Sequence, residues 1–478
     1  MTQPAIAELL SLPGKHPAFQ ELLRRLRLAQ SGLGPQTIAL CGLTPTAKAL
    51  YLTLLWKVEL RPIIVVVEDP KRAEAFAETA RAFFEALFED REAPRPQLLP
   101  AMDVLPGQGL SPHAEICQQR ALALWRLAVE RVPITIAPVA SALLRLQPPE
   151  FYRQLALRLR VGDEACLEDV VAHLESVGYQ RRDPVEMVGE YAVRGGILDV
   201  FSPEAGHPVR IEFFGDQIES MRRFDPATQR SVARTDQCLL LPMAEQPRTP
   251  ALMDELRRFL GLEAGDPPGW ELLAPLVKPR DSSLVEQVEK PIVVLDEPAL
   301  LEAAAERLWR RLREDPRTAA LGPERIFLPW DDLRERARRS PEIELHELSV
   351  AGKPGSLEII TRPALSFQGN IRVAIAEARN LVETGHRVIF FAPTTGELER
   401  TAEIFNEYEL PFQLNLKPGE SVPPYLAERA WLSGVATGTY LTKGAVSHGA
   451  IFPESGLAIF GSEDLFGTAR WATRPVRQ

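Results

Sequence analysis

The sequence predicts an α/β protein with more than one parallel-sheet unit, and three observations lead to that prediction. Short apolar or β-branched runs, such as residues 37–41 and 63–67, alternate with segments of helical periodicity. At residue 150 this alternation gives way to closely spaced short strands bounded by Gly, Pro and Asp, and it resumes near residue 251. The length of 478 residues is about three times that of a typical domain.

The first unit is predicted from its hydrophobic pattern, with a strand at 134–137 following those at 37–41 and 63–67. Residues 47–58, 72–88 and 115–129 carry apolar side chains at helical spacing. Because parallel strands need a crossover between them, this order of elements favours a parallel sheet flanked by helices.

The middle of the chain is predicted to be an α+β insert. A helix at 167–177 comes first, and it is followed by short strands at 191–201, 209–214, 219–224 and 238–241. Three prolines within residues 242–250 mark the joint at which the first unit resumes.

The rest of the chain alternates between helix and strand again. Helices are predicted at 253–260 and 299–313, with strands at 292–295 and 325–328. A Gly- and Pro-containing joint at 351–356 precedes a last unit, for which we expect helices at 371–382 and 397–408 and strands at 387–392 and 457–461. The resulting domain prediction is 1–150 and 248–350 for one module, 151–247 for its insert and 351–478 for a third α/β domain.

Charge and cysteine content exclude several classes of protein. With 55 Lys and Arg against 65 Asp and Glu, the net charge of −10 supplies no overall attraction to nucleic acid. The four cysteines (Cys41, Cys117, Cys166 and Cys238) are too widely spaced for a zinc ribbon, and the seven histidines include no HExxH pattern, so we expect no metal site. We interpret the cysteines as reduced, buried thiols of a cytoplasmic protein, and the short apolar runs predict no membrane segment.

One turn has the outline of a phosphate-binding loop. Gly42 and Lys48 occupy the first glycine and the lysine of a GxxxxGK[ST] pattern between a strand and a helix. Ala47 replaces the second glycine, and Ala49 replaces the hydroxyl residue that would hold Mg²⁺. The pattern therefore favours a degenerate nucleotide site, and the alternative is a plain strand-to-helix turn with a solvated lysine.

A second motif has the form of a Walker B strand. The apolar run 292–295 ends in Asp296 and Glu297, where a working motor places its Mg²⁺-binding and water-positioning carboxylates. With no competent loop for the phosphates, we interpret both residues as vestigial. The alternative is a pair of strand-end carboxylates before a helix that starts at Pro298.

The segment 189–230 is rich in arginine. It reads GEYAVRGGILDVFSPEAGHPVRIEFFGDQIESMRRFDPATQR, and residues 181–235 hold eight arginines, no lysine and nine carboxylates. This balance does not suit nucleic acid, whereas arginine without lysine suits bidentate pairing with carboxylates at a protein interface. Phe213 and Phe214 cannot both face one core from a strand, so one of them is a candidate exposed anchor. A solvated sheet face is the alternative.

The same segment resembles the inserted domain shared by the excision-repair helicase UvrB and the transcription-repair coupling factor (Mfd) family. Residues 98–113 and 365–467, together with the degenerate loop, are more similar to the Mfd family than to UvrB. The resemblance implies a degenerate helicase-like, P-loop NTPase-type sheet module with an inserted α+β domain, followed by a separate flavodoxin-like domain. It also implies that the chain is a truncated N-terminal region.

The resemblance further implies a function without catalytic residues in this chain. It places UvrA-contacting residues at Arg194, Arg210 and Phe214, and it implies recruitment of excision repair to stalled RNA polymerase. RNA polymerase, DNA, ATP and Mg²⁺ would be bound by domains that this chain lacks, so no cofactor is expected here. The competing prediction is a UvrB-like ATP-dependent helicase that uses Lys48 with the carboxylates of Asp296 and Glu297. A module that binds DNA directly is disfavoured by the net charge.

Overall fold

The computed structural model describes residues 5–34, 36–88, 94–348, 355–415 and 438–467. Its centre is a seven-stranded sheet in the order β15-β1-β14-β13-β2-β4-β3, in which every neighbouring pair is parallel. The strands are β1 (Thr37–Cys41), β2 (Ile63–Val67), β3 (Gln97–Leu98), β4 (Ile134–Pro138), β13 (Ile292–Asp296), β14 (Glu342–His346) and β15 (Leu357–Glu358).

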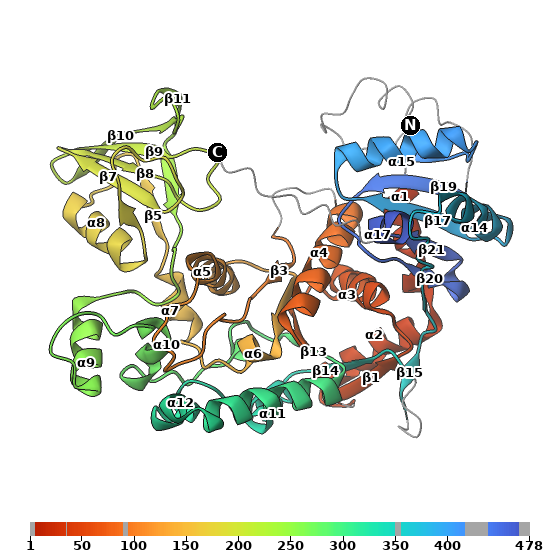
Figure 1. The fold of residues 1–478 in the computed structure, drawn as a ribbon, viewed down its shortest axis with the longest axis horizontal. Coiled ribbons are helices and arrows are strands. Elements are labelled where there is room, and N and C mark those ends of the chain that lie inside the picture. The colour runs from red at the N-terminus through yellow and green to blue at the C-terminus, as the bar shows by residue number, and fades with distance from the viewer. Residues whose placement is uncertain (1–4, 35, 89–93, 349–354, 416–437, 468–478) are drawn as a thin grey trace.

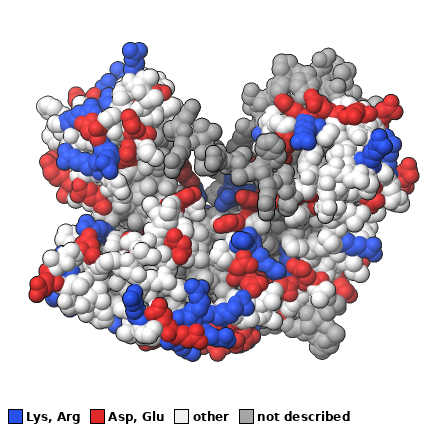
Figure 2. Space-filling model, viewed as in Figure 1, with Lys and Arg blue, Asp and Glu red and all other residues white. Residues whose placement is uncertain are grey.

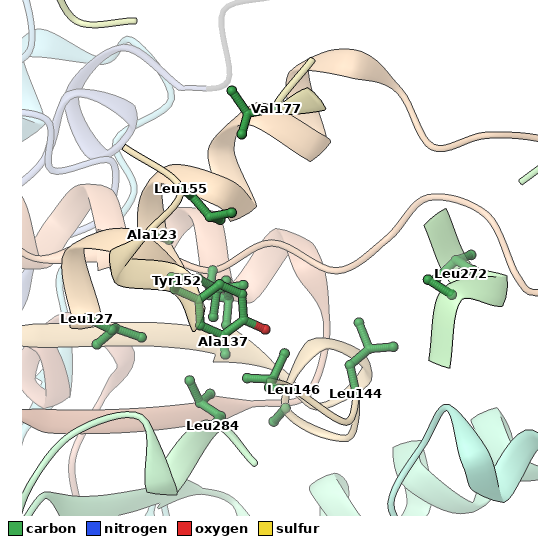
Figure 3. Packing of buried hydrophobic residues seen from close by; sticks show 14 of the residues in the cluster. Ala123, Leu127, Ala137, Leu144, Leu146, Tyr152, Leu155, Val177, Leu272 and Leu284 are labelled. Atoms are coloured by element: carbon green, nitrogen blue, oxygen red, sulfur yellow. The ribbon is translucent and has the colours of Figure 1, made fainter. Parts of the chain in front are cut away.

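Helices cover both faces of this sheet (Figure 1). One face shares a hydrophobic cluster with α1 (Ala5–Leu10), α2 (Pro17–Gln30), α3 (Pro45–Glu59) and α4 (Pro70–Leu87). The other face packs on α5 (Ala114–Val129), α6 (Val139–Ala142), α7 (Pro149–Arg153), α9 (Pro250–Leu260), α10 (Trp270–Leu273), α11 (Pro298–Glu314) and α13 (Trp330–Ala337), and Figure 3 shows part of this second cluster. The short α12 (Pro316–Ala320) follows α11.

The sequence sets the starts of the main crossover helices. Helices α3, α4 and α11 each begin with a proline directly after a strand-end turn, where the missing N–H costs nothing. In α4 the side chain of Asp69 also accepts a hydrogen bond from the Arg72 N–H at 3.0 Å. These signals are local, which is why these helices were predicted to within a few residues.

The inserted domain contains a six-stranded mixed sheet in the order β11-β10-β9-β8-β7-β6. Helix α8 (Leu167–Ser176) packs on one face, which we call the inner face. A separate antiparallel pair joins β5 (Leu157–Arg160) to β12 (Gln237–Leu240). The sheet strands are β6 (Gln180–Arg181), β7 (Glu190–Arg194), β8 (Ile197–Val200), β9 (Val209–Phe214), β10 (Gln217–Phe224) and β11 (Ser231–Arg234).

The last unit is a second mixed α/β sheet in the order β16-β20-β21-β17-β19-β18. Its strands are β16 (Arg362–Pro363), β17 (Arg387–Ala392), β18 (Gln413–Asn415), β19 (Thr439–Lys443), β20 (Ala450–Phe452) and β21 (Leu457–Phe460), and its helices are α14 (Ile371–Glu383), α15 (Thr395–Glu407) and α17 (Ser462–Phe466). One face packs on α14 and α15, while the other packs on α3 and α4. The centroids of the Phe83 and Phe391 rings lie 5.8 Å apart across this contact. The unit therefore has its own sheet but shares a hydrophobic core with the first module.

Several sequence predictions differ from the structure. Residues 325–328 form no strand, because Arg325 ends a 3-10 turn and Phe327 makes only an isolated bridge with Leu144. Residues 191–201 form two strands, since Gly195 (φ +62°) and Gly196 make a hairpin turn between β7 and β8. Ten of the described strands were not predicted, and they are β3, β5, β6, β11, β14, β15, β16, β18, β19 and β20. The joint at 351–356 lies largely outside the described residues.

The cysteine prediction holds only in part. Cys41 is buried, but the other three thiols are partly exposed, and all four are free. Among the described residues, no helix combines the length and apolar character needed to cross a membrane. The described part of the chain also contains no cluster of three or more His, Cys, Asp or Glu side chains placed to hold a metal ion.

Candidate functional site

Arg194, Arg210 and Phe214 lie on one face of the inserted sheet, which we call the outer face. Arg210 and Phe214 are four residues apart on β9, and the register pairs Asp199 of β8 with Arg210. Because successive side chains alternate, these residues point away from the inner face, where Leu198 and Ile211 pack near α8. The structure therefore brings the three predicted contact residues to one surface.

Phe214 is an exposed aromatic side chain at the end of β9. Its relative exposure is 78%, whereas the neighbouring Phe213 packs against the inner-face core. The prediction that the two rings cannot share one core is confirmed. Gly215, with φ +59°, begins the turn into β10 and leaves the Phe214 ring at the tip of the hairpin. An exposed ring of this size is a feature of protein-binding surfaces.

Arg210 is held tightly within its own domain. Its Nε and Nη2 donate to the two carboxylate oxygens of Asp199 at 2.7 and 2.8 Å, and its guanidinium lies 4.8 Å from the centroid of the Phe224 ring. The hydrogen bonds to Asp199, a residue only 3% exposed, raise the pKa of Arg210. Arg210 therefore balances the charge of the buried Asp199 through a bidentate ion pair, and only part of its side chain is available to a partner.

Arg194 makes a more open pair. Its Nε donates to Asp183 at 2.9 Å, and about half of each side chain is exposed. Arg222 similarly bonds Glu212 on the same face. Arg194, Arg210 and Arg222 are thus each paired with a carboxylate of the same domain. Figure 2 shows both signs of charge intermingled on the face in view. This arrangement does not form a phosphate-binding surface.

Gly42, Lys48, Asp296 and Glu297 come together at the carboxyl edge of the seven-stranded sheet. Lys48 Nζ lies 2.5 Å from Asp296 Oδ1 and 2.8 Å from Glu297 Oε1, and its side chain is only 1% exposed. A third carboxylate, that of Glu347, lies 3.7 Å away. The alternative of a solvated lysine is wrong. Burial opposes the charge on Lys48, but the carboxylates of Asp296 and Glu297 raise its pKa on balance, so it stays protonated.

The chain itself covers the turn that resembles a phosphate loop. Residues 357–361 run alongside it, with Ile359 N–H donating to Cys41 O at 3.0 Å and Thr361 N–H to Gly42 O at 2.9 Å. The Thr44 N–H donates to Thr361 Oγ1 at 2.8 Å. In a working loop, backbone N–H groups at this place bind phosphate. Here at least one of them already has a partner within the chain.

Two contributors to this site were not predicted from the sequence. Glu347 follows the unpredicted strand β14, and Thr361 lies more than 300 residues from the turn that it contacts. No local motif marks either residue. Local motifs did single out Lys48, Asp296 and Glu297, which are in contact, and Gly42, which lies at the same edge of the sheet. Their interpretation as a vestigial nucleotide site stays a prediction.

Comparison with known proteins gives a consistent picture. Residues 157–245 match the UvrB interaction domain family, and this range includes Arg194, Arg210 and Phe214. The transcription-repair-coupling factor of Mycobacterium tuberculosis is 31% identical over an alignment of 517 residues, which covers 97% of this chain and 39% of that protein.

Two further relatives carry the same description. The protein of Myxococcus xanthus is 29% identical over 486 residues, covering 92% of this chain and 40% of the relative. The protein of Escherichia coli is 25% identical over 451 residues, covering 89% of this chain and 38% of the relative. The chain thus spans about two fifths of the length of these relatives. It is homologous to the N-terminal ~40% of transcription-repair-coupling factors and contains a UvrB interaction domain.

Proposed function

We propose that this chain is the non-catalytic adaptor segment of a transcription-repair coupling factor, and that its outer face binds UvrA. The observation that carries the proposal is the exposed Phe214 ring, at the tip of a hairpin and on the same face as Arg194 and Arg210. Aromatic and arginine side chains dominate the energetics of protein interfaces. In the cytoplasm of a bacterium, such a contact would recruit excision repair to RNA polymerase stalled at a lesion.

In this proposal, the seven-stranded sheet is a helicase-like module that has lost the ability to bind a nucleotide. Ala47 and Ala49, the buried ion pairs of Lys48 and the occupied Thr44 N–H support this interpretation. The third sheet would be a flavodoxin-like domain. The ATP, Mg²⁺, DNA and polymerase sites of a complete translocase would lie in the part of the relatives that this chain does not span. The alternative, a UvrB-like helicase, requires measurable ATP binding by this chain.

Truncation of the Phe214 ring tests the proposed interface. In a calorimetric titration with purified UvrA, Phe214→Ala should weaken binding by about 2 kcal/mol, or roughly 30-fold. Phe259→Ala is the matched control, because Phe259 is also an exposed phenylalanine but lies on α9, outside the inserted sheet. Equal affinity of Phe214→Ala and the wild-type chain would refute the assignment of this face.

Arg194 gives a second test that preserves the fold. Its ion pair with Asp183 is solvent-exposed, so Arg194→Ala should cost little stability yet weaken UvrA binding about tenfold. Arg248→Ala removes a similarly exposed arginine–aspartate pair in the segment that returns from the insert, outside the strands of the outer face, and serves as its control. Arg210 is less suitable, since its removal would leave the buried Asp199 without a partner.

A further inference from the structure

A second surface of the inserted domain, on the inner side of its sheet, has features of a binding site. A cleft of about 470 Å³ lies between β12, the loop 202–207 and the inner face of β8 and β9. Val200 and Val209 contribute to its lining, and they alternate along their strands with Asp199 and Arg210 of the outer face. The cleft is therefore distinct from the surface proposed to bind UvrA.

The cleft follows an unpaired strand edge. Five consecutive residues (237–241) line it, although successive side chains of a strand point to opposite sides. A cleft that touches all five must run along the edge of β12 and not along one of its faces. Among the described strands β12 pairs only with β5, so no described strand covers its other edge.

Hydrogen bonding identifies which backbone groups point into the cleft. The Val161 N–H donates to Asp236 O at 2.9 Å, so even-numbered residues of this segment face β5 and odd-numbered residues face away. In agreement, the Leu241 N–H donates to Ser202 Oγ, Tyr179 Oη donates to Leu241 O, and Thr235 Oγ1 donates to Gln237 O, so these outward-facing groups already have partners. The same alternation directs the N–H and C=O of Leu239 away from β5 and along the cleft.

The cleft is lined by two arginines and by one carboxylate, that of Glu204, which already pairs with Arg126 of α5. Arg158 of β5 and Arg223 of β10 both line the cleft and are exposed, and neither makes an ion pair within the described part of the chain. This contrasts with Arg194, Arg210 and Arg222 of the outer face, each of which bonds a carboxylate. The lining also includes the partly exposed side chains of Ala205, Cys238 and Leu239.

We propose that this cleft binds an extended acidic segment of a partner protein as an added β-strand beside β12. The backbone of the segment would pair with Leu239, its carboxylates would pair with Arg158 and Arg223, and its alternate apolar side chains would contact the partly exposed Ala205 and Leu239. Strand addition gives affinity through the main chain and specificity through alternate side chains. Because the edge lies inside a cleft, it admits a single strand while remaining shielded from edge-to-edge aggregation.

The probe is a fluorescein-labelled, acetylated hexapeptide of alternating Glu and Leu, titrated with the full chain by fluorescence anisotropy. We expect saturable binding, a loss of at least tenfold in affinity for Arg158→Glu/Arg223→Glu, and no change for Arg234→Glu, an exposed arginine on β11. Deuterium exchange should slow over residues 236–241 when the peptide binds, because the Leu239 N–H becomes hydrogen-bonded.

Two variant peptides separate strand addition from simple charge attraction. A peptide N-methylated at alternate residues keeps every carboxylate but cannot pair with a strand, and it should bind at least tenfold more weakly. A peptide with Lys in place of Glu should not bind. The proposal is overturned if the N-methylated peptide binds as well as the parent, if the double arginine variant retains full affinity, or if no binding is detected. None of these results bears on UvrA binding to the outer face.

Discussion

At the residue scale, the buried Lys48 is bound to the buried Asp296 and to Glu297, whose side chain is partly exposed. Withdrawing these groups from water costs several kcal/mol per ion, and only their mutual attraction offsets that cost. The interaction therefore contributes little net stability when intact, but the loss of one partner leaves an uncompensated buried charge. The sensitivity of the site to substitution follows from this asymmetry.

Lys48→Met should lower the free energy of unfolding by about 3–5 kcal/mol, because the Asp296 carboxylate is left buried without its cation. Urea unfolding followed by tryptophan fluorescence measures this loss. Lys57→Met is the matched control on the same helix, since Lys57 is exposed, and it should change stability by less than about 0.5 kcal/mol. Similar losses for the two variants would contradict the buried ion pair.

The same variant should show a defined pH dependence. Burial raises the pKa of Asp296, and the charge on Lys48 opposes this rise, so removal of Lys48 should raise the pKa further. A group whose pKa is higher in the folded state favours folding below its unfolded pKa and loses that contribution as the pH rises. The stability deficit of Lys48→Met should therefore shrink as the pH falls from 7 toward 4. A deficit that grows over this range would contradict the assignment.

At the scale of elements, the strand β15 is held against the end of β1 by close backbone contact. Gly42 has φ +86°, and a Cβ placed there would lie 2.5 Å from Ile359 O. A side chain at this position would collide with backbone, which cannot rotate away as a side-chain end could. The glycine that resembles the first residue of a phosphate loop thus permits the approach of residues 357–361.

Gly42→Ala should displace β15 and lower the free energy of unfolding. The loss should exceed the cost of placing an alanine at a positive φ, which is about 1–2 kcal/mol by itself. Gly109→Ala isolates that strain, because Gly109 has φ +71° but open space around its Cβ position. In Gly42→Ala, hydrogen exchange should also become faster at the Ile359 and Thr361 amides, which donate to Cys41 O and Gly42 O. Unchanged exchange at these amides would show that β15 tolerates the methyl group.

At the scale of the whole molecule, a buried polar cluster ties the inserted domain to the central module. Arg120 of α5 is fully buried, and it donates to Glu245 Oε2 at 2.7 Å and to Ser141 Oγ at 2.8 Å. Arg280 lies 3.7 Å from the same glutamate. Glu245 belongs to the segment that returns from the insert, so this cluster fixes the chain where the two units join.

Glu245→Ala should cost about 3–5 kcal/mol in unfolding free energy, because Arg120 would remain buried without a carboxylate. Glu204→Ala is the control, since the Arg126–Glu204 pair also links α5 to the insert but is partly exposed, and its loss should cost less than about 1 kcal/mol. Thermal unfolding monitored by calorimetry compares the two. An equal, small effect of both substitutions would show that the buried cluster does not secure the junction.

Local patterns in the sequence determined much of the fold. Strands Thr37–Cys41, Ile63–Val67 and Arg387–Ala392 were predicted with the bounds that the structure shows. Buried parallel strands are recognisable because both faces of each strand are covered and the run is almost wholly apolar. The roles of Arg194, Arg210 and Phe214 in binding stay a prediction, although their common face is now described.

Tertiary structure decided the elements that local patterns misrepresent. Strand β14 places Glu342 and Glu344 in the interior, where Arg334 of α13 lies within 3.3 Å of both carboxylates, so its sequence looks polar although the strand is buried. The converse holds for the apolar residues 325–328. There Leu328 uses its N–H on Leu143 O, and its carbonyl accepts from Trp309 Nε1, so neither group is left for a sheet.

The sequence by itself determined the α/β class, the position of the insert and the identities of Gly42, Lys48, Asp296 and Glu297 as one constellation. It did so because strand order and turn chemistry are local properties of the chain. Only the tertiary structure decided that Lys48 is buried, that residues 357–361 cover the turn and that β12 borders an open cleft. Each of these depends on segments far apart in sequence, whose approach is set by packing and by the pairing of buried charges.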